Sequence, residues 1–205
     1  PLGSSDFSAI VTKIKQANPD FIYSDLVGDS VVAFYKEYKQ QGLSPETCPI
    51  ASIATDEMSN QAMGAEYAAG HYTSMNYFET LDTPANKKFV QAYYDKFKDG
   101  STITTLAEAT YDSCYLLKAA IEKVEDPTDT DSLIEAFAGL EFDAPQGKIK
   151  VDETNHCTWL YSRFAKCNAE GKFDIVYESS NALKPEPWPQ VVYPELNGGL
   201  PEKTY

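Results

Sequence analysis

Hydrophobic residues recur in alternating helical and extended patterns along the first part of the chain. Phe7, Ile10 and Ile14 are spaced as on one face of a helix, whereas Phe21-Ile22-Tyr23 is a short apolar run typical of a buried strand. Such patterns predict helices over residues 5–17 and 28–41, strands over 21–23, 49–54 and 70–78, and a short helix beginning at residues 55–57. This alternation with short connections predicts a parallel sheet with helices packed against it.

Capping residues mark the ends of the first two helices. Ser5 or Asp6 is expected to cap the first helix, Asn18-Pro19 to end it, and Asp29 to cap the second helix. The pattern begins with a helix, so the strand that would complete the first unit is not in the given sequence. This order fits a chain cut from a longer one.

The chain changes character at Thr83, where three helical patterns follow one another without an intervening strand. Thr83-Pro84 is a good start, because proline suits the first turn of a helix. The three helices are expected over residues 83–98, 104–124 and 128–138. Three successive helices fit the cover of a second lobe whose own sheet lies elsewhere.

After residue 140 the sequence turns from helices to strands. Pro145 excludes a continuing helix, and Gly147 permits a turn with positive φ. Residues rich in β-branched and aromatic side chains then predict strands over 148–151, 158–166 and 173–178, the last two joined by a hairpin loop over 167–172. The five prolines within residues 182–205 predict an extended tail.

Charge and apolar content restrict the partners. The formal net charge of −14 argues against nucleic acid and against anionic membrane surfaces, because both would repel the chain. No apolar run in the sequence approaches the ~20 residues that a membrane-spanning helix needs.

The four cysteines do not form the pattern of a disulfide scaffold, since they are few and widely spaced. Cys157 and Cys167 are placed at opposite ends of one predicted strand, so they are not expected to bond each other. Cys114 shares the apolar face of the 104–124 helix with Tyr111 and Leu117, so it is expected to be a buried thiol. The sequence has no CxxC motif and only 2 histidines, so neither a zinc site nor another cofactor is expected.

Short motifs follow one another in a fixed order along most of the chain. They are Val27-Gly28-Asp29-Ser30, Pro49-Ile50-Ala51-Ser52-Ile53-Ala54-Thr55, Asn76-Tyr77-Phe78, Asp82-Thr83-Pro84-Ala85-Asn86, Ala107-Glu108-Ala109-Thr110-Tyr111, Asp143-Ala144-Pro145-Gln146-Gly147 and Lys184-Pro185-Glu186-Pro187. Each motif is weak alone, but their order and spacing closely resemble the later half of the short-chain amide- and urea-binding members of the type I periplasmic binding proteins.

The resemblance implies an α/β fold in which a parallel sheet with flanking helices forms parts of two lobes joined by hinge strands. It divides the chain into residues 1–76 as the α/β part of the second lobe, 77–143 as helices of the first lobe, 144–180 as the hinge return and β-hairpin of the second lobe, and 181–205 as an extended Pro-rich tail. Crossovers between the lobes would fall near residues 74–80 and 143–150. The missing N-terminal half is expected as a second polypeptide or from a swapped protomer.

Ligands of open parallel sheets sit at the carboxyl ends of the strands. The resemblance places the ligand contacts of the second lobe there, at Thr55, Ser52 and Ala54, with Val27 and Leu26 as an apolar wall. A hydroxyl suits an amide ligand because it can donate to the carbonyl and accept from the NH2 group. The alternatives are that Thr55 only caps the helix that follows, and that Leu26 and Val27 only pack against their neighbours.

The resemblance implies binding without catalysis. The ligand would be urea or a small uncharged amide such as acetamide or formamide, delivered to an ABC permease in the membrane from a periplasmic or extracytoplasmic location. The alternative is a ligand sensor that uses the same clamp in a signalling or gene-regulatory system.

Two candidate catalytic pairs are better explained by local structure. Asp56 and Glu57 are acidic residues in the first turn of a helix, as the helix dipole favours. His156 and Cys157 are neighbours on a predicted strand and would point to opposite faces.

Overall fold

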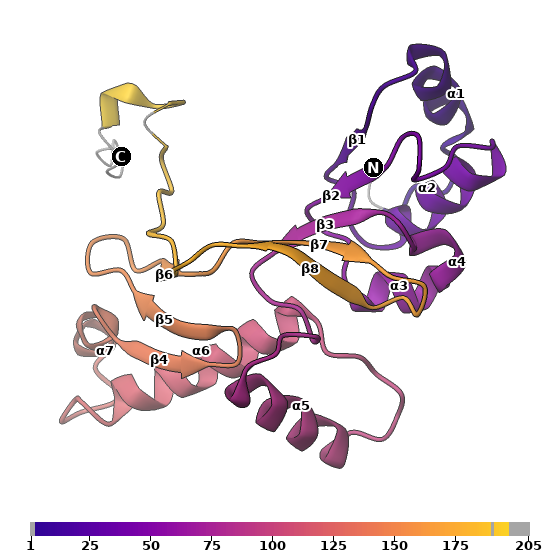
Figure 1. Ribbon diagram of the computed structural model, residues 1–205. Helices are drawn as coiled ribbons and strands as arrows, with labels where there is room; N and C mark the ends of the chain where they lie inside the picture. Colours follow the sequence, from indigo (N-terminus) through magenta and orange to yellow (C-terminus); the bar gives the residue numbers. More distant parts are fainter. Residues whose placement is uncertain (1–2, 190, 197–205) are drawn as a thin grey trace.

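The computed structural model describes residues 3–189 and 191–196, and its strands form two separate sheets (Figure 1). The strands are β1 (Ile22–Ser24), β2 (Ile50–Ser52), β3 (Tyr72–Met75), β4 (Glu141–Ala144), β5 (Gly147–Val151), β6 (Thr158–Trp159), β7 (Arg163–Cys167) and β8 (Phe173–Glu178). The helices are α1 (Ser8–Ala17), α2 (Asp29–Gln40), α3 (Glu57–Met63), α4 (Ala65–Ala68), α5 (Pro84–Lys96), α6 (Thr105–Ile121), α7 (Thr130–Phe137) and the 3-10 helix η1 (Pro194–Leu196).

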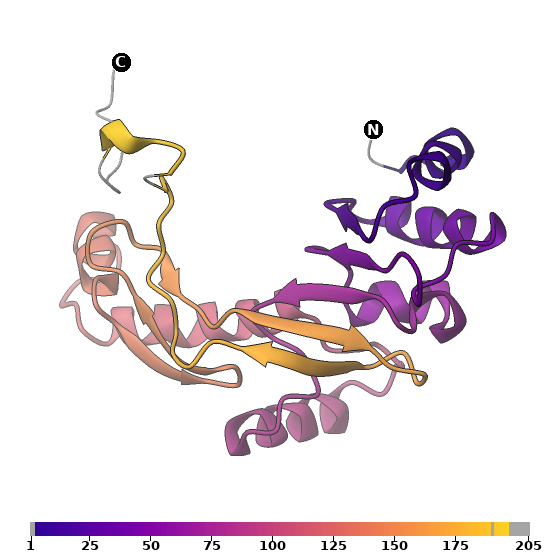
Figure 2. The same cartoon turned by 45° about the horizontal axis from the view of Figure 1, so that its top comes forward.

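The larger sheet has five strands in the order β1-β2-β3-β7-β8. Its first three strands are parallel, as the α/β alternation predicts, and the β7–β8 hairpin adds to β3 in the antiparallel direction. The sheet is therefore mixed. Figures 1 and 2 show the hairpin running from the end of the molecule that holds β4–β6 to the end that holds β1 and β2, with α5 below it in both views.

The core of the larger sheet is built on the apolar faces of α1 and α2. Val31, Phe34, Tyr35 and Tyr38 recur at helical spacing along α2 and are all buried. They pack in one cluster with Val11 of α1 and with residues of β2, β7 and β8. This cluster holds β1 and β2 in place, and with them the loops that follow these strands.

The second core lies between α6, α7 and the three-stranded sheet β4-β5-β6. Leu116 and Ala120 of α6 pack there with Ile149 and Val151 of β5. Both long helices of this part start at a threonine that accepts a hydrogen bond from the third residue on, Thr83 for α5 and Thr104 for α6. The predicted start at Thr83-Pro84 is confirmed.

The opposite face of α6 has no cover from the described residues. Leu106, Leu117 and Ile121 are exposed there, and Ile134 of α7 is exposed as well. The prediction of a buried Cys114 is wrong for this chain, because Cys114 lies on the same exposed face. The buried face of α6 carries Glu108 and Asp112 beside Leu116 and Ala120. The apolar face predicted from Cys114 and Leu117 is therefore not the face that packs inward.

Several predicted boundaries are wrong for a local reason. Gly28 (φ 63°) takes the N-cap position of α2, which makes Asp29 its first residue. Phe7 occupies the N-cap position of α1, and Asp6 instead accepts bonds from the amide and hydroxyl of Ser8. The end of α1 at Asn18, in the left-handed conformation (φ 46°), agrees with the prediction.

The strand predicted over residues 158–166 is two strands in two sheets. Thr158–Trp159 pairs with β5, whereas Arg163–Cys167 pairs with β3 and β8. Strand β4 was not expected, and it pairs with β5 through the turn at Pro145-Gln146. Of the predicted extended tail, residues 194–196 form the short 3-10 helix η1, and residues 190 and 197–205 lie outside the described residues.

Candidate ligand-binding site

The carboxyl ends of β1 and β2 lie side by side because the two strands are parallel and paired in register. The amide of Ile53 donates to the carbonyl oxygen of Ser24 at 3.2 Å, which ties the loop after β2 to the end of β1. The five residues expected to contact a ligand lie on these two loops or at the end of the second strand. They are Leu26 and Val27 on the first loop, and Ser52, Ala54 and Thr55 on the second.

The Ser52 hydroxyl organises the second loop from inside. Its oxygen accepts from the amides of Ala54 and Thr55, both at 3.1 Å, and from the Thr55 hydroxyl at 2.9 Å. The Thr55 hydroxyl also lies 3.2 Å from the hydroxyl of Tyr35. Ser52 and Thr55 are buried, so their hydroxyls fix the shape of the loop within the protein.

Helix capping falls to another residue. Asp56 is the N-cap of α3, and its side chain accepts from the amide of Ser59 at 2.8 Å. The alternative that Thr55 serves as the cap is therefore wrong. A direct bond from Thr55 to a ligand stays a prediction.

The first loop combines a packed residue with an exposed one. Leu26 packs against the core cluster of the larger sheet, while Val27 is 45% exposed. On the second loop, Ile53 is 49% exposed. Val27 and Ile53 therefore give this edge of the sheet an apolar surface; Ile53 was not among the expected contacts.

Arg163 joins the two segments expected to cross between lobes, and no sequence pattern predicted this role. Its guanidinium donates to the carbonyl oxygen of Asn76, in the first expected crossover, and to that of Gln146 in the second, at 2.7 Å. It also pairs with Glu178 of β8 at 2.8 Å. The Arg163 side chain is 1% exposed, whereas that of Glu178 is 43% exposed. The bond to Gln146 is therefore buried, and the ion pair reaches the surface at Glu178.

Two buried acidic residues of α6, Glu108 and Asp112, contact Gln146 in the second expected crossover. Glu108 Oε2 accepts from the side-chain amide of Gln146 at 3.0 Å, and Glu108 Oε1 accepts from the backbone amide of Gln146 at 3.2 Å. Asp112 lies one turn further along α6, and burial raises the pKa of both carboxyl groups. The turn at Gln146 is therefore fixed by α6 on one side and by Arg163 on the other.

Comparison with known families matches residues 1–194 to the periplasmic binding protein domain. A similar solved structure is the solute binding protein of an ABC transporter from Rhodopseudomonas palustris BisB5, in complex with 3,4-dihydroxybenzoic acid. It superposes with a TM-score of 0.77 at 24% identity, covering 87% of this chain and 50% of that one. This likeness shows the fold.

Two curated relatives carry different names. The Leu/Ile/Val-binding protein homolog 6 of Brucella suis is 28% identical over 162 residues, covering 77% of this chain and 41% of that protein. A protein of Geobacillus stearothermophilus named limonene hydroxylase is 32% identical over 125 residues, covering 61% of this chain and 23% of that protein. This chain thus spans less than half the length of both curated relatives. Narrower membership among amide- and urea-binding proteins stays a prediction, but the match over residues 1–194 is sufficient to conclude that the chain belongs to the periplasmic binding protein family.

Proposed function

We propose that this chain forms much of one lobe of a solute-binding protein that closes on a small uncharged amide, such as urea, acetamide or formamide, and delivers it to an ABC permease. The observation that carries the proposal is the pair of loops at the adjoining carboxyl ends of β1 and β2, tied by the bond from Ile53 to Ser24. Membership of a family of binding proteins supports binding without catalysis.

The five expected contacts on these loops favour a neutral ligand over an anion. Leu26, Val27, Ser52, Ala54 and Thr55 carry no charge. An anionic solute that left water for such a surface would lose its hydration without gaining a counter-charge. A neutral amide needs only donors and acceptors, which backbone groups and hydroxyls supply.

An amino acid is the second ligand class, because Asp25 is exposed directly after β1. Its carboxylate could receive the ammonium group of an amino acid. The substitution Asp25→Asn separates the two classes: it should weaken amino-acid binding by about 10-fold, since a charge-assisted hydrogen bond is lost, and leave amide binding nearly unchanged.

The exposed faces of α6 and α7 support a two-lobe arrangement. Full burial of a large apolar side chain contributes about 1.5–3 kcal/mol, and Leu106 and Ile121, which are 72% and 41% exposed, forgo part of it. The proposed cover is the sheet of the first lobe, in an N-terminal half present as a second polypeptide or in a swapped protomer. This chain spans 41% of the length of the Brucella suis relative and 50% of that of the solved structure.

The proposed location is periplasmic or otherwise extracytoplasmic, as the family description suggests. Within residues 3–189 and 191–196, none of the helices combines the length and the apolar character needed to cross a membrane.

A thermal-shift panel on the intact protein tests the ligand class. Urea, acetamide and formamide are compared with leucine and 3,4-dihydroxybenzoate, each at several concentrations. A ligand at 100 times its Kd stabilises the folded state by about 2.7 kcal/mol, so the melting temperature should rise with amide concentration. A rise with leucine or 3,4-dihydroxybenzoate, and none with any amide, would overturn the amide assignment.

A further inference from the structure

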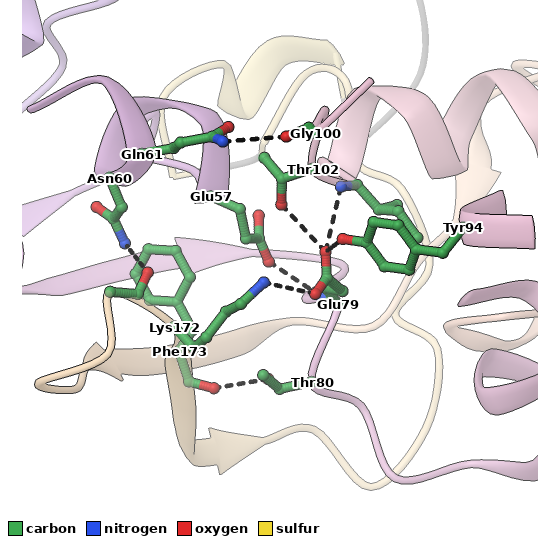
Figure 3. Close-up of polar contacts among 12 residues, drawn as sticks. Glu57, Asn60, Gln61, Glu79, Thr80, Tyr94, Gly100, Thr102, Lys172 and Phe173 are labelled. Carbon is green, nitrogen blue, oxygen red and sulfur yellow. Dashed lines mark hydrogen bonds and ion pairs between the residues drawn. The ribbon is translucent and has the colours of Figure 1, made fainter. Parts of the chain in front are cut away.

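A cavity of about 290 Å³ lies between α3, the tip of the β7–β8 hairpin and the loop from α5 to α6 (Figure 3). The hairpin tip follows β7, which runs antiparallel to β3, with Lys166 near the end of β7 paired to Tyr72 at the start of β3. The tip therefore lies at the opposite edge of the sheet from the carboxyl ends of β1 and β2. None of the five expected amide contacts lines the cavity, although Glu57, which does line it, follows Thr55 by two positions.

Glu57 lines this cavity, and only one of its two carboxylate oxygens has a hydrogen-bond partner among the described residues. The side chain is buried, and its Oε1 accepts from the backbone amide of Glu79 at 3.0 Å. Its Oε2 is buried too and has no hydrogen-bond partner among the described residues. Burial is the main cause that raises the pKa of Glu57, to about 7. A buried carboxylate without a counter-charge is costly, so a cation beside it would be stabilised.

Lys172, which also lines the cavity, is engaged by another carboxylate. Its Nζ pairs with Glu79 Oε1 at 2.6 Å. Glu79 Oε2 in turn accepts from the hydroxyls of Tyr94 and Thr102, and Figure 3 shows these groups converging on Glu79 rather than on Glu57. The positive charge of Lys172 is thus neutralised by Glu79, and Lys172 does not serve as the counter-charge of Glu57.

The remaining lining suits a cation that donates several hydrogen bonds. Gly100 and Gly171 present carbonyl oxygens that each accept one bond at 3.0 Å, from Gln61 and Asn60 respectively, and a carbonyl oxygen has a second lone pair to offer. Tyr94 adds an aromatic ring to the wall, which favours an organic cation. Among residues 3–189 and 191–196, no group of three or more His, Cys, Asp and Glu could hold a metal ion.

We propose that this cavity is a second binding site, which takes a small primary alkylammonium ion whose N–H groups donate to Glu57 Oε2 after the Glu57 side chain turns toward the cavity. The ion contacts α3, the hairpin tip and the α5–α6 loop together, so it joins parts of the chain that are far apart in sequence. The cavity holds several times the ~30 Å³ share of one water molecule, which leaves room for the ion and accompanying water.

Calorimetric titration of the intact protein with methylammonium chloride tests the site. Tetramethylammonium chloride is the matched probe, since it carries the same charge without N–H donors. Saturable binding is expected for methylammonium, with an affinity about 10-fold higher than that for tetramethylammonium. In a parallel NMR titration, the Glu79 backbone amide should shift with the same saturation curve, because it donates to Glu57.

The substitution Glu57→Gln keeps the shape of the side chain and removes its charge, and should lower methylammonium affinity by about 10-fold or more. Glu135→Gln, at an exposed position of α7 outside the lining, is the control and should bind nearly as wild type. Unfolding curves check that both variants fold. Equal binding by wild type and Glu57→Gln, or by the two probes, would overturn the proposal, as would the lack of saturable binding.

The readouts for the two sites are independent. Acetamide affinity should be nearly the same in Glu57→Gln and wild type. If wild type binds methylammonium but no amide, the second site stands and the proposed ligand class falls. If wild type binds acetamide but not methylammonium, the proposed ligand class stands and the second site falls.

Discussion

Nη2 of Arg163 donates a 2.7 Å hydrogen bond to the carbonyl oxygen of Gln146, across the junction between the larger sheet and the turn from β4 to β5. The same guanidinium binds the carbonyl oxygen of Asn76 and the carboxylate of Glu178. A planar, permanently charged group with several donors can satisfy three such partners at once. Arg163 therefore fixes the two expected crossover segments relative to each other.

Replacing Arg163 should be among the most destabilising single changes in the chain. Arg163→Met leaves the carbonyl oxygens of Asn76 and Gln146 without this donor and should cost about 3 kcal/mol, measured by urea unfolding. Arg163→Lys keeps the charge but has all its N–H donors on one nitrogen, which cannot reach the three partners as the guanidinium does, so an intermediate loss is expected. Lys166→Met, which removes an exposed charge from the same strand, is the control. Equal midpoints for Arg163→Met and Lys166→Met would contradict this role.

His71 should make the fold sensitive to mild acid. Its Nδ1 accepts from the amide of Ile50 at 3.0 Å, and burial lowers its pKa to about 4. Between pH 6.5 and 4 the unfolded chain binds a proton that the folded chain refuses, so stability falls as pH falls through this window. The loss should be on the order of 3 kcal/mol. The contribution of His71 is the difference between the unfolding free energies of wild type and His71→Gln at each pH, because the other groups titrate alike in both proteins. If this difference does not change between pH 6.5 and 4, His71 is not the cause of the acid sensitivity.

Thr55→Val tests whether the second loop must keep its shape for binding. The change removes the bonds to Ser52 and Tyr35 and should cost about 1–2 kcal/mol of folding stability. Because the loop forms the proposed amide site, acetamide affinity should fall by about 10-fold as well, which is roughly the worth of one hydrogen bond. Tyr35→Phe removes only one of the two bonds and should have a smaller effect on both. Unchanged acetamide affinity in a folded Thr55→Val protein would exclude Thr55 from the site.

Cys114 reports directly on the cover proposed for α6. In this chain alone Cys114 and Cys157 are exposed, whereas Cys48 and Cys167 are buried with a raised pKa, so a maleimide should label only the first two quickly. In the intact two-lobe protein Cys114 should become protected while Cys157 still reacts. Labelling of Cys114 at the same rate in both would mean that this face of α6 stays open.

Local chemistry accounts for what the sequence predicted well. Helix starts at Thr83 and Thr104, and the end at Asn18, depend on residues within one turn, and the structure has them as expected. The alternation of helices and strands before Thr83 was enough to predict the parallel order of β1, β2 and β3.

Long-range contacts explain the failures. The sequence from Thr158 to Lys166 predicts one strand. In the structure its first two residues pair with β5 in the smaller sheet, and the residues from Arg163 on pair with β3 in the larger sheet. Leu117 and Cys114 form an apolar stripe on α6, yet Glu108 and Asp112 turn inward because Gln146 of the β4–β5 turn bonds to both.

The same limit applies to the candidate sites. Ser52 and Thr55 are neighbours in sequence, so their joint position at the end of β2 could be predicted. The local sequence indicates only an ordinary first-turn acid at Glu57, because the bond to its carboxylate comes from Glu79, 22 positions along the chain. The bond from Arg163 to Asn76 spans 87 positions, and no local pattern indicates it.

Calorimetric titration of the intact protein with acetamide, and separately with leucine, tests the central claim most directly. The account expects saturable heat with acetamide at one ligand for each two-lobe unit, and no saturable heat with leucine. Saturable heat with leucine together with none for acetamide, urea or formamide would contradict the assignment of the β1 and β2 loops to a neutral amide.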